Sequence, residues 1–269
     1  MNYSKTSATL KTNAKKYMSG KYYTTFMVLL FYVMLTIFWS GFSTSLSERI
    51  LLTTRRFVSL DTTASAFLYS GVIWLLSLIF NIFDIGFCLY FLNIACGNMF
   101  HIFNLFYGFS HQFGKCLLLS GINFLLTAVC TIPLKILHVQ YIATNTIHLP
   151  TLCSLLCIQL VLFVFYVPIS LALSQLYFVM LDYPDLSVAD TLKQSIRIMK
   201  GHYLQLCYIQ ASFLPLYLLA FLSLNIGLIW VVPYTRMTYA LFYLDLMKPA
   251  KGSRPVPPVS IDLSTPEEI

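Results

Sequence analysis

The chain has 269 residues, of which 58% are hydrophobic, 16% aromatic and only 10% charged. Soluble domains carry about 25% charged residues, so this composition excludes an ordinary water-soluble protein and predicts lipid as the surroundings of most of the chain. The net charge of +7 lies beside apolar segments, so we expect it to contact an anionic membrane surface and not nucleic acid.

Six continuously apolar segments are each long enough to cross a bilayer as a helix, which takes about 20 residues. They lie at residues 22–42, 66–94, 114–137, 152–178, 203–223 and 226–246. Transmembrane strands would instead alternate apolar and polar residues. We therefore predict an all-α polytopic membrane protein with six transmembrane helices in a single domain, residues 1–246, followed by a disordered cytoplasmic tail at 247–269.

The domain divides into three similar repeats, at about residues 5–94, 99–178 and 187–246, each of which is a surface helix followed by a transmembrane hairpin. In the first repeat, a basic segment ends at Gly20 and Lys21, just before the first span. A chain that turns from the membrane surface into the bilayer needs a residue that tolerates positive φ, and glycine does so at the lowest cost. We predict a hinge at Gly20.

The second span carries a polar stripe, because Ser77, Asn81 and Asp84 fall on one face of a helix. Asp84 lies about twelve residues from the cytoplasmic end of the span, roughly 18 Å deep. Ionisable residues at such depth are expensive and tend to be functional. The stripe is interpreted either as the lining of a small hydrated cavity or as a set of interhelical hydrogen bonds.

The second repeat opens with a more apolar segment, from Met99 to Phe113, and its Gly114 and Lys115 reproduce the pairing of glycine with a cation. We therefore predict a second hinge at Gly114.

The third repeat contains the clearest surface helix, at about residues 188–200. Ser187 can cap this helix with Asp190 in a capping box, and Gly201 can end it as a third hinge. One face carries Val188, Leu192, Ile196 and Met199, and another carries Lys193, Arg197 and Lys200. Such a helix is expected to lie flat on the membrane with its cations near anionic lipid headgroups.

The sixth span carries Arg236 at a depth similar to that of Asp84. The two charges could form a pair that fixes how the repeats pack, or they could belong to a substrate or ion site. Lys and Arg gather on one side of the predicted spans, and positively charged loops resist translocation. Both termini are therefore expected in the cytoplasm.

The sequence contains no sign of a cofactor, a metal site or a catalytic centre. It lacks a His-Glu-x-x-His motif, a phosphate-binding glycine loop and a Gly-x-Ser-x-Gly motif. The seven cysteines include no Cys-x-x-Cys pair and are expected to be buried small residues. We expect a protein that is not an enzyme and needs no cofactor.

Both ends of the chain resemble domain-of-unknown-function family 975. The residues that carry the resemblance are Leu10, Lys11, Ala14, Met18, Gly20, Lys21 and Tyr22 near the N-terminus, and, within Ser195 to Leu246, Met199, Lys200, Gly201, His202, Asn225, Ile226, Gly227, Leu228, Trp230, Pro233, Tyr234, Thr238, Tyr239, Ala240, Phe242 and Tyr243. The resemblance implies a bacterial multi-pass protein of the cytoplasmic membrane with no established activity. A more distant similarity is to the membrane domain of some glycerophosphodiester phosphodiesterases, whose hydrolase domain this chain lacks.

Two functions remain open from the sequence. The first is a non-enzymatic accessory or organising protein, whose cationic helices bind anionic lipid or a membrane protein partner. The second is a transporter or permease subunit for a small or lipid-like solute, with a binding site near the polar stripe of the second span.

Overall fold

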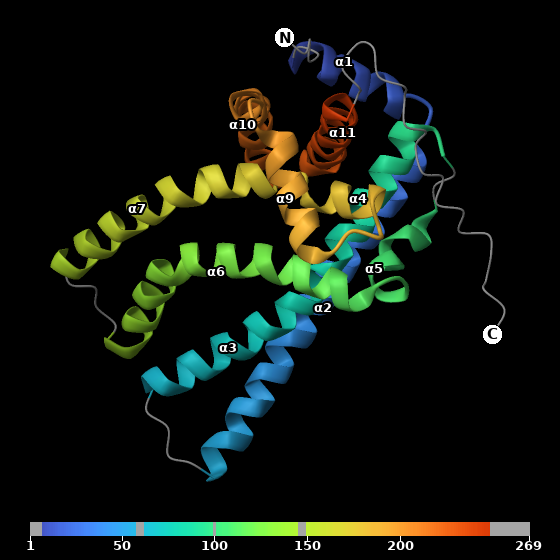
Figure 1. Cartoon of the computed structure of the whole chain (residues 1–269). Helices are drawn as coiled ribbons and strands as arrows, with labels where there is room; N and C mark the ends of the chain where they lie inside the picture. The colour runs from blue at the N-terminus through green and yellow to red at the C-terminus, as the bar shows by residue number, and fades with distance from the viewer. Residues whose placement is uncertain (1–6, 58–61, 99–100, 145–148, 248–269) are drawn as a thin grey trace. The chain divides into compact units, whose positions relative to one another are not determined.

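The structure, a computed structural model, describes residues 7–57, 62–98, 101–144 and 149–247. These residues are 89% helical and contain no strand (Figure 1), which confirms the predicted all-α class. The helices are α1 (Ser7–Met18), α2 (Tyr22–Phe57), α3 (Thr62–Phe80), α4 (Ile82–Cys96), the 3-10 helix η1 (Ile102–Phe106), α5 (Tyr107–Ser110), α6 (Phe113–Thr144), α7 (Leu149–Leu173), α8 (Leu176–Asp182), α9 (Val188–Met199), α10 (Tyr203–Leu222) and α11 (Leu228–Leu246). The tail predicted to be disordered lies, apart from Met247, outside the described residues.

Five helical stretches of the described chain are long and apolar enough to cross a membrane. They are Tyr22–Thr54, Leu68–Cys96, Phe113–Leu137, Leu149–Asp182 and Tyr203–Leu222, and they coincide with the first five predicted spans. The sixth predicted span is the 19-residue helix α11, which is absent from this set. It carries Arg236 and Asp245, two charged residues in a helix of this length, and the count of six is not confirmed.

Helix α2 extends farther than the sequence analysis expected. It runs for 36 residues, to Phe57, whereas the first predicted span ends at residue 42. A helix of this length is about 54 Å long, whereas the hydrocarbon core is about 30 Å thick. Part of α2 must therefore extend beyond the hydrocarbon if the helix crosses the bilayer upright.

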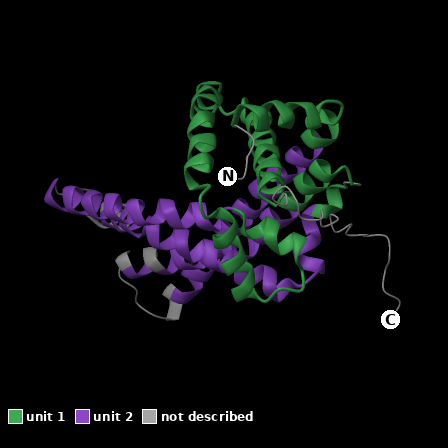
Figure 2. Ribbon diagram, turned by 45° about the horizontal axis from the view of Figure 1, so that its top comes forward, with its two compact units in different colours: residues 1–26, 87–104, 175–269 green, residues 27–86, 105–174 purple. Residues whose placement is uncertain are grey.

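The chain divides into two compact units, coloured separately in Figure 2. Unit 1 comprises residues 1–26, 87–104 and 175–269, and unit 2 comprises residues 27–86 and 105–174. Helices α2 and α4 contribute residues to both units. Segments from the two ends of the chain therefore belong to the same unit.

In unit 1, α1 packs chiefly along α11 and also touches α10, while α8 packs on α9. The stripe of α1 that makes these contacts is Leu10, Ala14 and Met18, with exposed fractions of 1%, 0% and 3%. Residues four apart lie on one side of a helix, so one face of α1 is covered by protein. Its apolar stripe is thus not free to lie in the membrane surface.

Unit 2 is organised around α6, which packs against α3 on one side and α7 on another. Aromatic side chains join α3 and α6, because the Trp74 ring meets the Phe124 ring edge-on at 6.2 Å. The ammonium of Lys135 lies 3.9 Å from the centre of the Trp74 ring, within the range of a cation–π contact. A cation inside an apolar helix is thereby held against an aromatic surface.

Candidate functional site

The polar stripe of the second span lies where the helix is interrupted. Helix α3 ends at Phe80, Asn81 forms a turn and α4 begins at Ile82. The Asp84 N–H donates to the Asn81 carbonyl over 3.2 Å, a tighter turn than an α-helix makes. The predicted single helical face is thus split between two helices, which the uniform apolar pattern of residues 66–94 did not indicate.

Within unit 2, the Asp84 carboxylate, in the first turn of α4, has a hydrogen-bond partner on α2. The Tyr32 hydroxyl donates to Oδ1 of Asp84 over 2.9 Å. A negative charge is favoured at a helix N-terminus, so the break in the helix also stabilises the carboxylate. The Ser77 hydroxyl donates to the Ile73 carbonyl of its own helix over 2.8 Å, and so this part of the stripe is turned toward the backbone.

Arg236 belongs to unit 1, whereas Asp84 belongs to unit 2. The Arg236 guanidinium carbon lies 5.6 Å from the centre of the Phe87 ring, so an aromatic face contributes to holding this charge. The predicted pairing of Asp84 with Arg236 stays a prediction.

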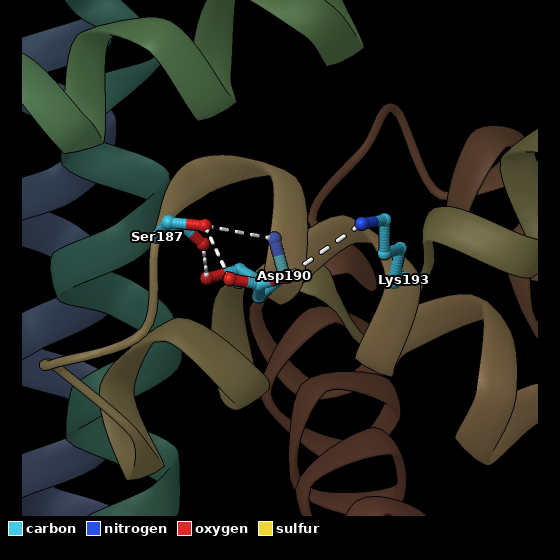
Figure 3. A network of polar contacts seen from close by, with 4 residues as sticks. Ser187, Asp190 and Lys193 are labelled. Atoms are coloured by element: carbon cyan, nitrogen blue, oxygen red, sulfur yellow. Dashed lines mark hydrogen bonds and ion pairs between the residues drawn. The ribbon is translucent and has the colours of Figure 1, made fainter.

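The predicted cap of α9 by Ser187 is confirmed (Figure 3). The Ser187 hydroxyl oxygen accepts from the Asp190 N–H over 3.2 Å, and the hydroxyl donates to Oδ2 of Asp190 over 2.6 Å. The Lys193 ammonium lies 3.7 Å from Oδ1 of Asp190, and both side chains are exposed. Asp190 therefore fixes the helix start and also partly neutralises the first cation of the basic face.

The buried side of α9 differs from the predicted apolar face. The buried residues are Thr191, Ser195 and Met199, so small polar side chains form much of the contact with the protein. Ile196, expected on the apolar face, stays 39% exposed. The cations Lys193, Arg197 and Lys200 are all exposed and point away from the buried stripe at 100° per residue.

Two of the three predicted glycine hinges adopt the required conformation. Gly20 has φ +80° and Gly201 has φ +87°. In each turn the N–H of the next residue donates to the carbonyl two residues before the glycine: Lys21 to Met18 over 2.9 Å, and His202 to Met199 over 3.0 Å. The junctions of α1 with α2 and of α9 with α10 thus share one geometry.

The hinge predicted at Gly114 is wrong, because Gly114 lies inside α6, which begins at Phe113. The residue with positive φ before this helix is Gln112, at +48°. The preceding segment is also different, since it forms η1 and the short α5 in place of one amphipathic helix. In this segment Leu105 and Tyr107 are buried, whereas Phe103 is 77% exposed.

A cavity of about 460 Å³ lies within unit 1, between α1, the first turns of α2, and α11. It is lined by Lys15, Met18, Tyr22, Tyr23, Thr25, Phe26, Ile229, Trp230, Pro233 and Tyr234. Ser77, Asn81, Asp84 and Arg236 are not among these residues. No local pattern in the sequence indicates this cavity, because its lining residues come from both ends of the chain.

Among the residues that the structure describes, no three His, Cys, Asp or Glu side chains form a group that could hold a metal ion.

Comparison with known proteins gives one result. A family model described as "Protein of unknown function (DUF975)" matches residues 1–250. No curated protein and no solved structure matches the chain. Nothing in this match extends to the glycerophosphodiester phosphodiesterases, so that more distant similarity stays a prediction.

Proposed function

The chain belongs to the family of proteins of unknown function DUF975, and we propose that it is a non-enzymatic accessory or organising protein of the bacterial cytoplasmic membrane. The family supplies no activity, so the proposal depends on the chain's own helices. Several of them are long and apolar enough to cross a membrane. We count α11 as a sixth span, with both termini in the cytoplasm.

The shared turn at Gly20 and Gly201 supports a repeated design, in which a short helix leads through a left-handed glycine into a long apolar helix. The first and third repeats follow this design, and the second reaches α6 through Gln112 instead. Under this proposal, α9 lies at the cytoplasmic end of α10, the span that it precedes.

The exposed basic face of α9 is the observation that carries the proposal. The buried stripe of Thr191, Ser195 and Met199 attaches the helix to the protein, while Lys193, Arg197 and Lys200 stay exposed. Each Lys or Arg near an anionic leaflet contributes about 1 kcal/mol of attraction. A rigid helix with three such charges provides a surface on which anionic lipid headgroups or an acidic partner can gather.

Mild crosslinking in native membranes tests this function, followed by identification of the lipids and proteins that co-purify. The key variant reverses three charges, Lys193→Glu, Arg197→Glu and Lys200→Glu. The matched control keeps them, as Lys193→Arg, Arg197→Lys and Lys200→Arg. We expect a defined set of partners in the wild type and the control, and its loss in the charge-reversed variant. Identical sets in all three proteins contradict the proposal.

A transporter or permease subunit is the second candidate, and the break at Asn81 favours it. Interrupted membrane helices whose polar ends meet an ionisable residue are typical of transporter binding sites. Asp84 at the start of α4, bonded to Tyr32, is such an arrangement. This function predicts a solute that raises the thermal stability of the purified protein, and loss of that rise in Asp84→Ala. A solute screen without any such response contradicts it.

A further inference from the structure

The cavity in unit 1 has no part in either function proposed above. Its size falls in the range of small-molecule sites, about 300–1,000 Å³. Nine of its ten lining residues are uncharged, and five of them are aromatic. Lys15 is the one charged residue among the ten, and no carboxylate lines the cavity with it. The cavity is therefore amphipathic, with a broad aromatic and aliphatic wall and one cation.

The aromatic wall is open to its surroundings. Tyr22, Tyr23 and Trp230 are exposed by 50%, 72% and 63%. In a membrane, exposed aromatic rings contact lipid, so the hollow that they surround is open to an acyl chain. The rings and the neighbouring Ile229 and Phe26 offer a surface that fits a hydrocarbon chain better than a polar solute.

The cation lies at one edge of this wall. The Lys15 ammonium is 5.5 Å from the centre of the Tyr234 ring, a contact that favours the cation over the aromatic face. Lys15 itself is exposed. Its charge is thus held beside the cavity and is accessible to a ligand.

Helix α1 carries a second cation, Lys11, close to Lys15. Lys11 and Lys15 are one helical turn apart, and like charges at this spacing repel. The pKa of Lys11 lies below its usual value because the side chain is desolvated and because Lys15 is near. An anion beside Lys15 would offset this repulsion.

We propose that this cavity binds an anionic phospholipid, with the phosphate at Lys15 and an acyl chain against Phe26, Ile229 and Trp230. An anionic phospholipid complements both the cation and the apolar wall. A free phosphate would leave the wall uncovered, and a zwitterionic lipid would bring a second cation toward Lys15. The proposal uses the membrane location given above and does not depend on the basic face of α9.

Native mass spectrometry and thermal unfolding of the delipidated full chain in detergent test this site. The probes are phosphatidylglycerol, phosphatidylcholine with the same acyl chains, and glycerol 1-phosphate without chains. The variants are Lys15→Ala, Lys16→Ala as a control of equal charge change outside the cavity, and Trp230→Ala. Lys15, Lys16 and Trp230 are all exposed, so none of these changes removes core packing.

We expect phosphatidylglycerol to bind and to raise the unfolding temperature more than phosphatidylcholine. Lys15→Ala should weaken phosphatidylglycerol binding about fivefold and remove the preference over phosphatidylcholine, because a Lys beside an anionic lipid contributes about that factor. Lys16→Ala should bind as the wild type does. Trp230→Ala should weaken the binding of both lipids, because it shortens the apolar wall.

Equal loss in Lys15→Ala and Lys16→Ala overturns the proposal, since the effect would then come from net charge alone. Stabilisation by glycerol 1-phosphate equal to that by the lipid also overturns it, because the apolar wall would then have no part. The α9 charge-reversed variant should keep phosphatidylglycerol at this cavity, and this separates a failure of the inference from a failure of the proposed function.

Discussion

The ammonium of Lys11 donates hydrogen bonds to the carbonyl oxygen and the hydroxyl of Ser212, 201 positions later in the chain. It also lies 4.1 Å from the centre of the Phe213 ring. The carbonyl, the hydroxyl and the neighbouring ring in the middle of α10 thus give a cation from α1 a place to bind.

This contact lies in the middle of α10, about 14 Å along the helix from Tyr203. A surface helix would instead be expected near the Tyr203 end. Lys11 therefore ties α1 to the hairpin of α10 and α11 at depth, where a backbone carbonyl and an aromatic ring take the place of water around the ammonium.

Lys11→Met keeps the aliphatic stem and removes the ammonium. We expect it to lower the free energy of unfolding by about 1–2 kcal/mol, since a hydrogen bond from a charged donor and a cation–π contact are lost. Lys16→Met, on the exposed side of α1, should leave stability unchanged. Thermal unfolding in detergent provides the measurement, and an equal effect of the two changes would show that the contact with Ser212 is not stabilising.

Gly201→Ala should lower the free energy of unfolding, and Gly114→Ala should raise it. A Cβ at either position meets no atom within 4 Å, so only the backbone decides. Gly201 has φ +87°, and alanine there should destabilise the protein by about 1–2 kcal/mol. Gly114 lies inside α6, where alanine should stabilise by about 0.5–1 kcal/mol. Thermal unfolding distinguishes them, and equal destabilisation would restore Gly114 as a hinge.

Tyr243→Phe removes a hydroxyl that donates to Oδ2 of Asp182 over 2.8 Å. The ring keeps its stacking on Phe178, at 5.4 Å between centres, so the change isolates the hydrogen bond. We expect a loss of about 1–2 kcal/mol in the free energy of unfolding, because a carboxylate loses its donor. Tyr208→Phe, at an exposed position, serves as the control. An unchanged unfolding temperature in Tyr243→Phe would contradict the assigned bond.

Tyr32 and Asp84 should couple in a double-mutant cycle. The single changes are Tyr32→Phe and Asp84→Asn, and the hydroxyl of Tyr32 donates directly to the carboxylate. We expect the two changes together to cost less than their sum, with an interaction energy of about 1 kcal/mol. Strict additivity would mean that the bond across α2 and α4 does not contribute to stability.

Two kinds of feature could be predicted from the sequence: helices that consist of long apolar segments, and helix ends that are capped by nearby residues. Continuous apolar runs gave five of the helices that can cross a membrane, and Ser187 with Asp190 gave the start of α9. The positive φ at Gly20 and Gly201 was predictable because a cation-bearing helix stops immediately before each of them. Gly114 is also followed by a lysine, but the apolar segment before it forms the short helices η1 and α5 and no long surface helix.

What could not be predicted depends on contacts between distant segments. The stripe of Leu10, Ala14 and Met18 is covered by α11 and α10, and its short periodicity suits a protein surface and a membrane surface equally. The helix break at Asn81 could not be predicted, because no proline or glycine lies at the break. The hydrogen bond from Tyr32 to Asp84 holds the start of α4, but it joins residues that are distant in the sequence. The cavity beside Lys15 needs residues from both ends of the chain, which no local pattern relates.

The most direct test of the whole account is the side of the membrane on which its helix junctions lie. After replacement of the seven native cysteines, single cysteines at Lys200 and Ile226, which flank α10, can be labelled with a membrane-impermeant maleimide. Both positions are exposed. The account predicts that position 200, at the basic face of α9, reacts only in inverted vesicles, and position 226 only in intact spheroplasts. Reaction of both positions from one side, or of position 200 from the outside, would contradict it.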